Sequence, residues 1–311
     1  MTGSIPTDRH LVVGAGPVGR HVAALLAERG SDVTVVTRSG RDTGIPGVQH
    51  VALDASDADA LSHAADGAAV LYNCANPTDY TQWEKVWPPL AAALLTAAER
   101  SGAVYAITGN LYPYGPVDGP MTEDLPDAAT DHKGVLRARL WADALAAHRA
   151  GRLRAVEVRS SDFVGPGVGA NGHVSRVVPA ASRGRSVTMI GRTDQPHTFT
   201  DVRDTARTLV AAAQDPGAHG RTWHTPSNPA RTQEEALTDV LASVGLAPVR
   251  VRSLRGAALA TAAVVSPLLR ELRDLAYQWE RPYVLADAAA RARFGIGPTP
   301  WDEVCRRTAR G

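Results

Sequence analysis

The sequence predicts an α/β protein, a Rossmann-type doubly wound parallel sheet with a small C-terminal lobe. In the first half, short runs rich in β-branched residues alternate with alanine-rich amphipathic stretches, which is typical of a parallel sheet with crossover helices. The strand-like runs are continuously apolar, as expected of strands covered on both faces. After Gly165 the alternation loosens, beginning with a glycine-dense loop at 165–172.

The elements follow in order along the chain. Strands are expected at 10–13, 32–37, 48–53, 68–73, 103–108 and 154–159, and a short later one at 186–190. Helices are expected at 18–29, 80–100 (disturbed at Pro88-Pro89), 131–149, 174–183, 202–214, 232–244 and 285–294. With no repeat and no Ser/Gly linker, we expect one compact unit: a dinucleotide-binding core at 1–165 and a mainly substrate-binding lobe at 166–311, of which about 186–215 returns to the core.

Composition excludes several classes of function. The formal net charge of +1 provides no field to hold nucleic acid or an anionic membrane. The longest apolar stretch, 256–269, is too short to span a membrane and contains Ser266-Pro267. Cys74 and Cys305 are far apart and show no metal-ligand spacing. Without a visible signal peptide, the sequence predicts a reduced cytoplasmic protein with a small-molecule substrate and no metal.

A glycine turn follows the first expected strand, with the sequence Gly14-Ala15-Gly16-Pro17-Val18-Gly19. The first glycine permits a tight turn, the second lets a pyrophosphate approach the backbone, and the third lets helix and strand pack closely. Pro17 and Val18 then begin a helix whose free N–H groups attract phosphate. The context predicts a dinucleotide site rather than an ordinary strand–helix turn.

The end of the second strand favours NADP(H) over NAD(H). No carboxylate lies between residues 33 and 41, where NAD-binding sites place an acidic residue, and Arg38 and Arg41 flank Ser39. Two cations beside a hydroxyl suit a 2′-phosphate, although they are also compatible with solvated surface arginines. Asp54 ends the third strand, where it either meets the adenine edge or caps the next helix.

Several segments together resemble the extended or atypical short-chain dehydrogenases/reductases, the NAD-dependent epimerase/dehydratase family. The resemblance covers nearly the whole chain. It includes the glycine turn, the small pair Cys74-Ala75, residues 111–115, RSSDFVGPG at 159–167, HTFTDVRD at 197–204, and 283–295 with Pro298-Thr299-Pro300. It implies redox chemistry at a nicotinamide, and a homodimer formed through the helices at 80–100 and 131–149.

The sequence departs from this family where its catalytic residues belong. The family's Tyr-x-x-x-Lys pair keeps its lysine as Lys133, one of only two lysines among 33 basic residues, but the tyrosine is replaced by Ala129. The resemblance makes Lys133 a contact of the nicotinamide ribose; the alternative is a surface lysine. Asn110 takes the place of the partner serine or threonine and keeps a hydrogen-bond donor. Tyr112 is either a displaced proton donor, once its pKa is lowered, or a packed aromatic.

The substrate is constrained by further departures. Leu111 replaces an acid of the dehydratases, and His197 stands where nucleotide-sugar members carry an arginine, so we expect a substrate other than a nucleotide sugar. Asn76, His197 and the loop residue His173 are the expected substrate contacts, although an isolated loop histidine is often merely exposed. Trp223, Tyr277, Trp279 and Tyr283 either wall the pocket or pack in the lobe.

The function predicted from these residues is an NADP(H)-dependent reductase, dehydrogenase or epimerase for a small carbonyl or alcohol. Because the tyrosine is missing, two alternatives stay open. One is a non-catalytic NADP(H)-binding sensor, and the other is a non-redox enzyme that reuses the fold.

Overall fold

The computed structural model describes residues 8–77 and 79–311. Its centre is a seven-stranded sheet with the order β10-β6-β5-β4-β1-β2-β3, and all its pairings are parallel. The strands are β1 Arg9–Val13, β2 Asp32–Thr37, β3 Val48–Ala52, β4 Val70–Asn73, β5 Val104–Asn110, β6 Arg154–Ser160 and β10 Thr222–His224. This order confirms the predicted Rossmann-type sheet, extended by one short strand.

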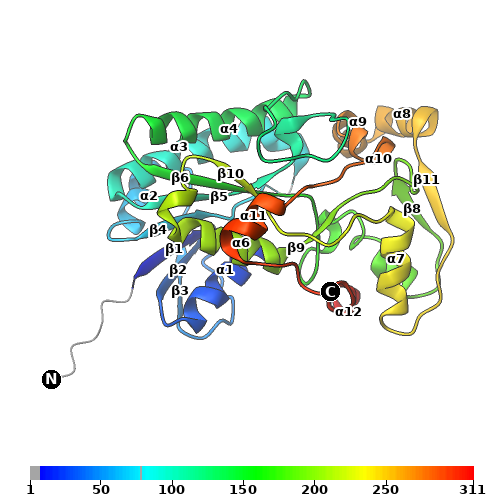
Figure 1. Cartoon of the computed structure of the whole chain (residues 1–311), viewed down its shortest axis with the longest axis horizontal. Coiled ribbons are helices and arrows are strands. Elements are labelled where there is room, and N and C mark those ends of the chain that lie inside the picture. Colours follow the sequence, from blue (N-terminus) through cyan, green and yellow to red (C-terminus); the bar gives the residue numbers. More distant parts are fainter. Residues whose placement is uncertain (1–7, 78) are drawn as a thin grey trace.

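Helices cover both faces of the sheet (Figure 1). One face packs against α1 Pro17–Glu28, α6 Val202–Gln214 and α11 Ala288–Phe294, and the other against α2 Ala58–Ala64, α3 Trp83–Ser101 and α4 His132–Arg149. Strand β1 shows why: Leu11 and Val13 point into the α2–α3–α4 core, while Val12 points into the α1–α6 core. Both faces are apolar, which is why the sequence shows continuous apolar runs.

The strand order reverses between β1 and β4, and this places the carboxyl ends of the strands around one opening. Val13 at the end of β1 is level with Val36 of β2 and with Asn73 of β4. On the other side, Asn110 at the end of β5 is level with Ser160 of β6. Ligands of open α/β sheets bind at such a reversal.

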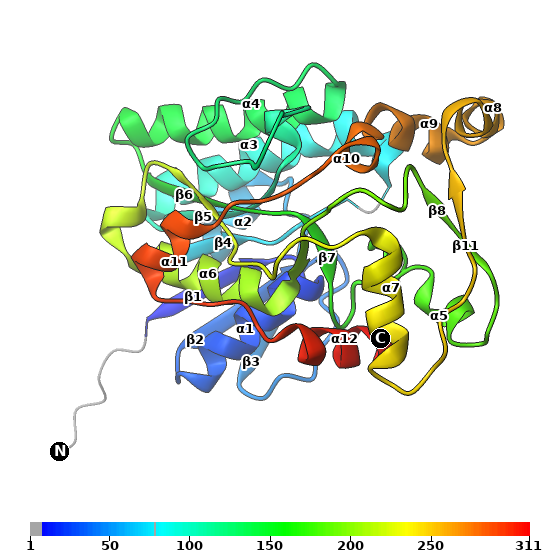
Figure 2. The ribbon, with the colours of Figure 1, turned by 45° about the vertical axis from the view of Figure 1, so that its right-hand side comes forward.

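The C-terminal half builds a lobe beside this edge, with small sheets and short helices (Figure 2). Two parallel pairs lie there, β11 Val251–Leu254 with β8 Val187–Ile190, and β7 Asp162–Val164 with β9 Phe199–Asp201. The helices are α5 Val178–Ala181, α7 Gln233–Ala242, α8 Gly256–Val265, α9 Pro267–Asp274, α10 Tyr277–Glu280 and α12 Trp301–Arg310. The 3₁₀ turns are η1 Tyr80–Gln82, η2 Tyr112–Tyr114, η3 Gly169–Asn171 and η4 Pro216–Ala218.

The division into a core ending at residue 165 and a lobe starting at 166 stays a prediction. Within the range 186–215, β8 lies in the lobe, whereas α6 packs against the sheet. Strand β10 also returns to the sheet, beyond that range.

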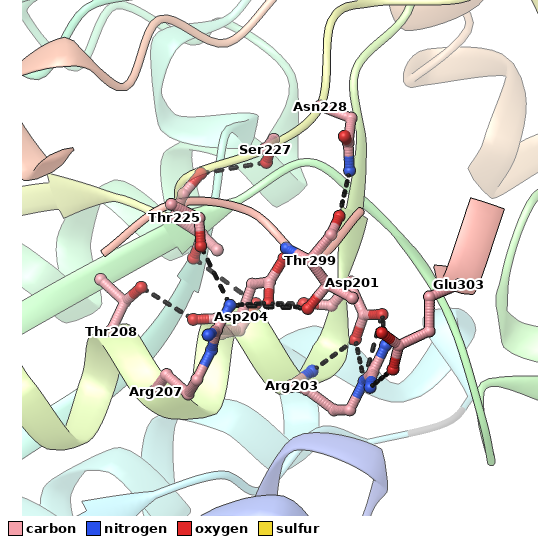
Figure 3. Close-up of polar contacts among 12 residues, drawn as sticks. Asp201, Arg203, Asp204, Arg207, Thr208, Thr225, Ser227, Asn228, Thr299 and Glu303 are labelled. Atoms are coloured by element: carbon pink, nitrogen blue, oxygen red, sulfur yellow. Dashed lines mark hydrogen bonds and ion pairs between the residues drawn. The ribbon is translucent and has the colours of Figure 1, made fainter. Parts of the chain in front are cut away.

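A polar network ties the C-terminal segment to the start of α6 (Figure 3). The Asp204 carboxylate accepts hydrogen bonds from Thr299 N at 2.7 Å and Thr299 Oγ1 at 2.6 Å. Arg203 bridges Asp201 to Glu303 of α12, and Asn228 donates to the carbonyl of Thr299 at 2.8 Å. The segment 197–204 and the Pro-Thr-Pro segment, noticed in the sequence for their resemblance, therefore hold each other in place.

The helix expected at 80–100 is divided into η1 and α3. Pro88 and Pro89 remain inside α3. Each removes a hydrogen bond to a carbonyl, of Glu84 and Lys85 respectively, and the helix tolerates this loss because these two residues lie on its exposed side. In the described part of the chain, no helix has the length and apolarity needed to cross a membrane.

Candidate active site

A cavity of about 820 Å³ opens at the carboxyl edge of the sheet, where the strand order reverses. The ends of β1, β2, β4, β5 and β6 form its floor, α3 supplies one wall, and Gln278 and Tyr283 of the lobe close the far end. Its volume lies toward the upper end of the usual range for ligand sites, about 300–1,000 Å³.

The glycine turn forms one end of this cavity and has the shape that a dinucleotide requires. Gly14 has φ +98°, and a Cβ on it would lie 2.8 Å from the backbone of Ala75. A Cβ on Gly19 would lie 2.0 Å from the carbonyl oxygen of Gly14, whereas a Cβ on Gly16 would meet nothing within 4 Å. The backbone is therefore packed tightly at the first and third glycines and open at the second, as pyrophosphate binding demands.

Helix α1 starts at this turn without a side-chain cap. Gly16 is the N-cap residue, Pro17 follows, and the first helical turn contains no acidic residue. Gly16, Pro17 and Val18 line the cavity, so the first-turn N–H groups are left for a ligand. The residues present thus fit a nicotinamide dinucleotide.

Next to the turn, only some of the residues predicted to contact the adenosine half of the cofactor line the cavity. Arg38 and Asp54 line the cavity, but Ser39 does not. Asp54 accepts hydrogen bonds from the backbone and hydroxyl of Ser56 at 3.0 and 2.7 Å, which lower its pKa, while Asp57 caps α2. Cys74, Ala75 and Asn76 also line the cavity, and burial raises the pKa of the Cys74 thiol to about 12.

Lys133, the predicted ribose contact, does not line the cavity. Its side chain is 1% exposed and its Nζ pairs with Glu271 of α9 and lies 2.9 Å from His132 Nε2. It also lies 5.9 Å from the centre of the Tyr80 ring, and burial lowers its pKa. The lobe therefore binds the lysine, while its role toward a cofactor stays a prediction.

Arg137, one helical turn after Lys133, occupies the cavity instead. The guanidinium donates from Nη2 to the carbonyl of Thr108 at 2.8 Å and lies 4.7 Å from the centre of the Trp87 ring. The residue is 5% exposed, and its Nε is buried without a partner among the described residues. A buried donor left unpaired is costly unless a ligand or water accepts its proton.

The end of β5 presents a donor and a pair of phenols to the cavity. Asn110 accepts at Oδ1 from the backbone N–H of Tyr112 at 3.2 Å, which leaves its amide NH₂ directed to other partners. The hydroxyls of Tyr80 and Tyr112 lie 3.1 Å apart, and both residues line the cavity. The lowered pKa required of Tyr112 as a displaced acid is not found, because burial raises it well above 10. Both hydroxyls stay protonated: one donates to the other, and the second keeps its proton for another acceptor.

Asp162, at the start of β7, brings a carboxylate to the far end of the cavity. Its Oδ2 accepts from Trp279 Nε1 at 3.2 Å and lies 3.0 Å from His197 Nε2, an ion-pairing distance at which the N–H is not aligned for a hydrogen bond. Burial alone would raise the pKa of Asp162, but His197, His173 and Trp279 outweigh burial and lower it to about 2.

The two predicted substrate histidines lie behind this wall and do not line the cavity. His197 Nδ1 lies 3.1 Å from the carbonyl oxygen of Gln278, and its ring stacks on Tyr283 with centres 5.1 Å apart. His173 stacks on Trp279 with centres 4.4 Å apart and bonds to Gln233. Burial lowers the pKa of His173 to about 3, so it is neutral. Direct substrate contact by either histidine stays a prediction.

Sequence reasoning missed Arg137, Asp162 and Tyr80. A signal existed for Asp162, since it is a carboxylate directly after the sixth strand, where ligand contacts are expected. For Arg137, the signal was its position four residues after Lys133. Within residues 8–77 and 79–311, no group of three or more His, Cys, Asp or Glu residues is placed to hold a metal ion.

Comparisons with known proteins agree with this geometry. The family model described as "NAD dependent epimerase/dehydratase family" matches residues 10–224. No curated protein matches the sequence. Among solved structures, MoeE5 in complex with UDP-glucose and NAD is similar at 20% identity and a TM-score of 0.78, over 97% of both chains. dTDP-glucose 4,6-dehydratase from Bacillus anthracis in complex with NAD is similar at 16% identity and a TM-score of 0.79, over 98% of this chain and 96% of that one.

A third similar structure is UDP-glucuronic acid 4-epimerase from Bacillus cereus, in complex with UDP-4-deoxy-4-fluoro-glucuronic acid and NAD. It shows 17% identity and a TM-score of 0.78, over 97% of this chain and 98% of that one. These complexes correct the prediction of a substrate other than a nucleotide sugar, because proteins of this fold that hold nucleotide sugars match nearly the whole chain. The substitutions Leu111 and His197 are thus insufficient to exclude that class.

The cofactor prediction is confirmed at the level of a nicotinamide dinucleotide, since the matched family is NAD dependent, while a preference for NADP remains a prediction. The matched residues span the glycine turn and the seven strands of the sheet, from β1 to β10. The chain belongs to the NAD-dependent epimerase/dehydratase family, enzymes of the short-chain dehydrogenase/reductase type.

Proposed function

We propose that this protein uses a nicotinamide dinucleotide to oxidise, epimerise or dehydrate a nucleotide sugar. The observation that carries the proposal is one continuous cavity, which runs from the glycine turn to the polar end formed by Asn110, Tyr112 and Asp162. Such a cavity brings a bound cofactor and a second ligand into contact. The choice of substrate class is supported by two of the similar structures, MoeE5 with bound UDP-glucose and the dTDP-glucose 4,6-dehydratase.

The adenosine end favours NADP(H) in this proposal. Arg38 lines the cavity, and within the described residues its guanidinium makes no salt bridge or side-chain hydrogen bond. A 2′-phosphate would give it charge-assisted bonds, whereas the ribose hydroxyls of NAD would meet no carboxylate at the carboxyl end of β2.

At the reacting end, the bound nicotinamide would accept or supply a hydride, and the chain would position the substrate oxygen. The Asn110 amide and the Tyr112 hydroxyl are the donors that would hold that oxygen. Tyr80, hydrogen-bonded to Tyr112, would pass the proton on. Arg137 would supply the permanent positive charge beside them, because its guanidinium stays protonated at any physiological pH.

The homodimer implied by the resemblance also remains a proposal. Val86 of α3 and Val135 of α4 are 38% and 48% exposed, and they lie on the two helices expected to pair. Light scattering of the protein, compared with a Val135→Lys variant, tests it: a dimer that becomes a monomer supports pairing through these helices.

Calorimetric titration with NADPH, NADH, UDP-glucose and dTDP-glucose tests the main proposal. We expect tight NADPH binding, weaker NADH binding, and conversion of at least one nucleotide sugar when the protein is incubated with the oxidised cofactor. Arg137→Met should retain cofactor binding but lose turnover. Failure to bind either dinucleotide contradicts the proposal, and dinucleotide binding without binding of any nucleotide sugar contradicts the substrate class alone.

A further inference from the structure

Asp162 is an unusual group to find at the substrate end of a site for a nucleotide sugar. A diphosphate carries negative charge, and a carboxylate beside it would repel it. The structure nevertheless commits several residues to keeping this carboxylate ionised, so its charge has a use in the cavity.

The support for the carboxylate comes from three elements of the lobe. Trp279 of α10 donates to Oδ2 at 3.2 Å, and His197, just before β9, lies 3.0 Å from the same oxygen. The ring of His173 stacks on Trp279, and the half-buried guanidinium of Arg176 interacts electrostatically with Asp162. These contacts fix the orientation of the carboxylate through one of its two oxygens.

The other oxygen, Oδ1, is available to a ligand. It has no hydrogen-bond partner within the described residues and is not enclosed, since the Asp162 side chain is 19% exposed and the residue lines the cavity. An ionised carboxylate only accepts hydrogen bonds, so its ligand must present donors. The neighbouring phenols of Tyr112 and Tyr283 stay protonated because burial raises their pKa, so the negative charge stays on Asp162.

We propose that Asp162 is a specificity residue that binds the hydroxyl groups of the sugar ring, with the diphosphate directed away from this end of the cavity. This inference rests on the proposed nucleotide-sugar function and adds an orientation to it. The sugar would lie between Asp162 and the Asn110–Tyr112 end of β5, which is where hydride and proton transfer need it. His197 and Trp279 are then positioning residues, which act through the carboxylate.

The sign of one substitution separates this orientation from the reverse one. Asp162→Asn removes the negative charge but keeps the size of the side chain. If the carboxylate binds sugar hydroxyls, the affinity for UDP-glucose should fall about 10- to 100-fold, while that for UDP stays within about twofold, because a hydrogen bond to a charged group is lost. If it faces the diphosphate, both ligands should bind more tightly.

The experiment is a calorimetric titration of the full-length protein, saturated with NADPH, with UDP-glucose and then UDP. Asp194→Asn, on an exposed loop, is the matched control and should leave both affinities unchanged. NADPH affinity and melting temperature report whether the variant has lost its fold, and Trp279→Phe, which keeps the carboxylate, should weaken UDP-glucose binding less than Asp162→Asn.

The outcomes distinguish the role of Asp162 from the proposed function of the protein. Unchanged or tighter UDP-glucose binding by Asp162→Asn overturns the inference and leaves the proposed function standing. If the unmodified protein binds neither UDP-glucose nor dTDP-glucose, the proposed substrate class is overturned, and this inference with it. A fall in NADPH affinity equal to the fall for UDP-glucose shows a merely structural carboxylate and also overturns the inference.

Discussion

The carboxylate of Asp204 offers the sharpest test of how the C-terminal segment is held to the core. It is 1% exposed and accepts from Thr299 N at 2.7 Å, Thr299 Oγ1 at 2.6 Å and Arg207 Nη2 at 2.5 Å. Asp204→Ala leaves the backbone N–H of Thr299 buried and unpaired, at about 1–3 kcal/mol, and removes a second hydrogen bond to a charged group, at about 1.5–3 kcal/mol. Burial raises the pKa of Asp204, so part of the free energy of these hydrogen bonds offsets the desolvation of the carboxylate. We expect a net destabilisation of about 3 kcal/mol.

Urea unfolding followed by tryptophan fluorescence measures this change. Thr299→Ala should lose about 1–2 kcal/mol, since only the hydroxyl bond is removed, and the double variant should lose less than the sum because the two residues interact. Asp302→Ala on α12 is the control: it breaks an exposed pair with Arg306 and should cost less than about 0.5 kcal/mol. A loss below about 1 kcal/mol for Asp204→Ala would refute the reasoning, because a buried triple acceptor would then be worth no more than a surface group.

Four further predictions concern the site. Gly19→Ala should abolish dinucleotide binding or folding, since its Cβ would lie 2.0 Å from the carbonyl of the preceding turn; unchanged NADPH titration contradicts this. Arg38→Ala should lower NADPH affinity about 10- to 100-fold and leave NADH affinity unchanged, and equal losses for both would exclude a 2′-phosphate contact. Arg137→Met should reduce kcat about 100-fold or more and Lys133→Met much less, measured by steady-state turnover; the reverse order would return the catalytic charge to the lysine. The pKa of His173 in the folded protein, about 3, lies below the ordinary 6.5, so its contribution to the free energy of unfolding is complete above pH 6.5 and falls by about 1.4 kcal/mol per pH unit below it. The free energy of unfolding of His173→Gln should therefore depend less on pH between pH 7 and 5.

The sequence predicted the sheet because its signals are local. The runs 32–37 and 202–214 coincide with β2 and α6, and the other strands of the first half agree to within two residues at each end. Periodicity did not reveal β10, whose three residues lie between turns, or the short helices α8 to α10, whose packing is decided by the lobe. The glycine turn was recognisable for the same local reason, since strand, turn and helix adjoin in the chain.

The far end of the cavity could not be predicted, because its partners are distant in sequence. Lys133 pairs with Glu271, 138 residues away, and Asp162 meets Trp279, 117 residues away. No periodicity reports such pairs. The resemblance predicted a cofactor contact for Lys133, which stays a prediction, and no local signal indicated that this lysine pairs with a carboxylate of α9.

These two contacts have a joint consequence for the chemistry. A lysine beside a cofactor can lower the pKa of a neighbouring tyrosine and also relay its proton, but here the lysine is bound by the lobe and the usual tyrosine is Ala129. Arg137, which lines the cavity together with Arg38 and Lys85, stays charged and cannot relay a proton. In the proposed function, proton transfer would pass through groups that hold protons at neutral pH, and within the described cavity lining the hydrogen-bonded phenols of Tyr80 and Tyr112 are such a pair. On this proposal the proton route would lie on η1 and η2 instead of helix α4, still at the carboxyl edge of the sheet.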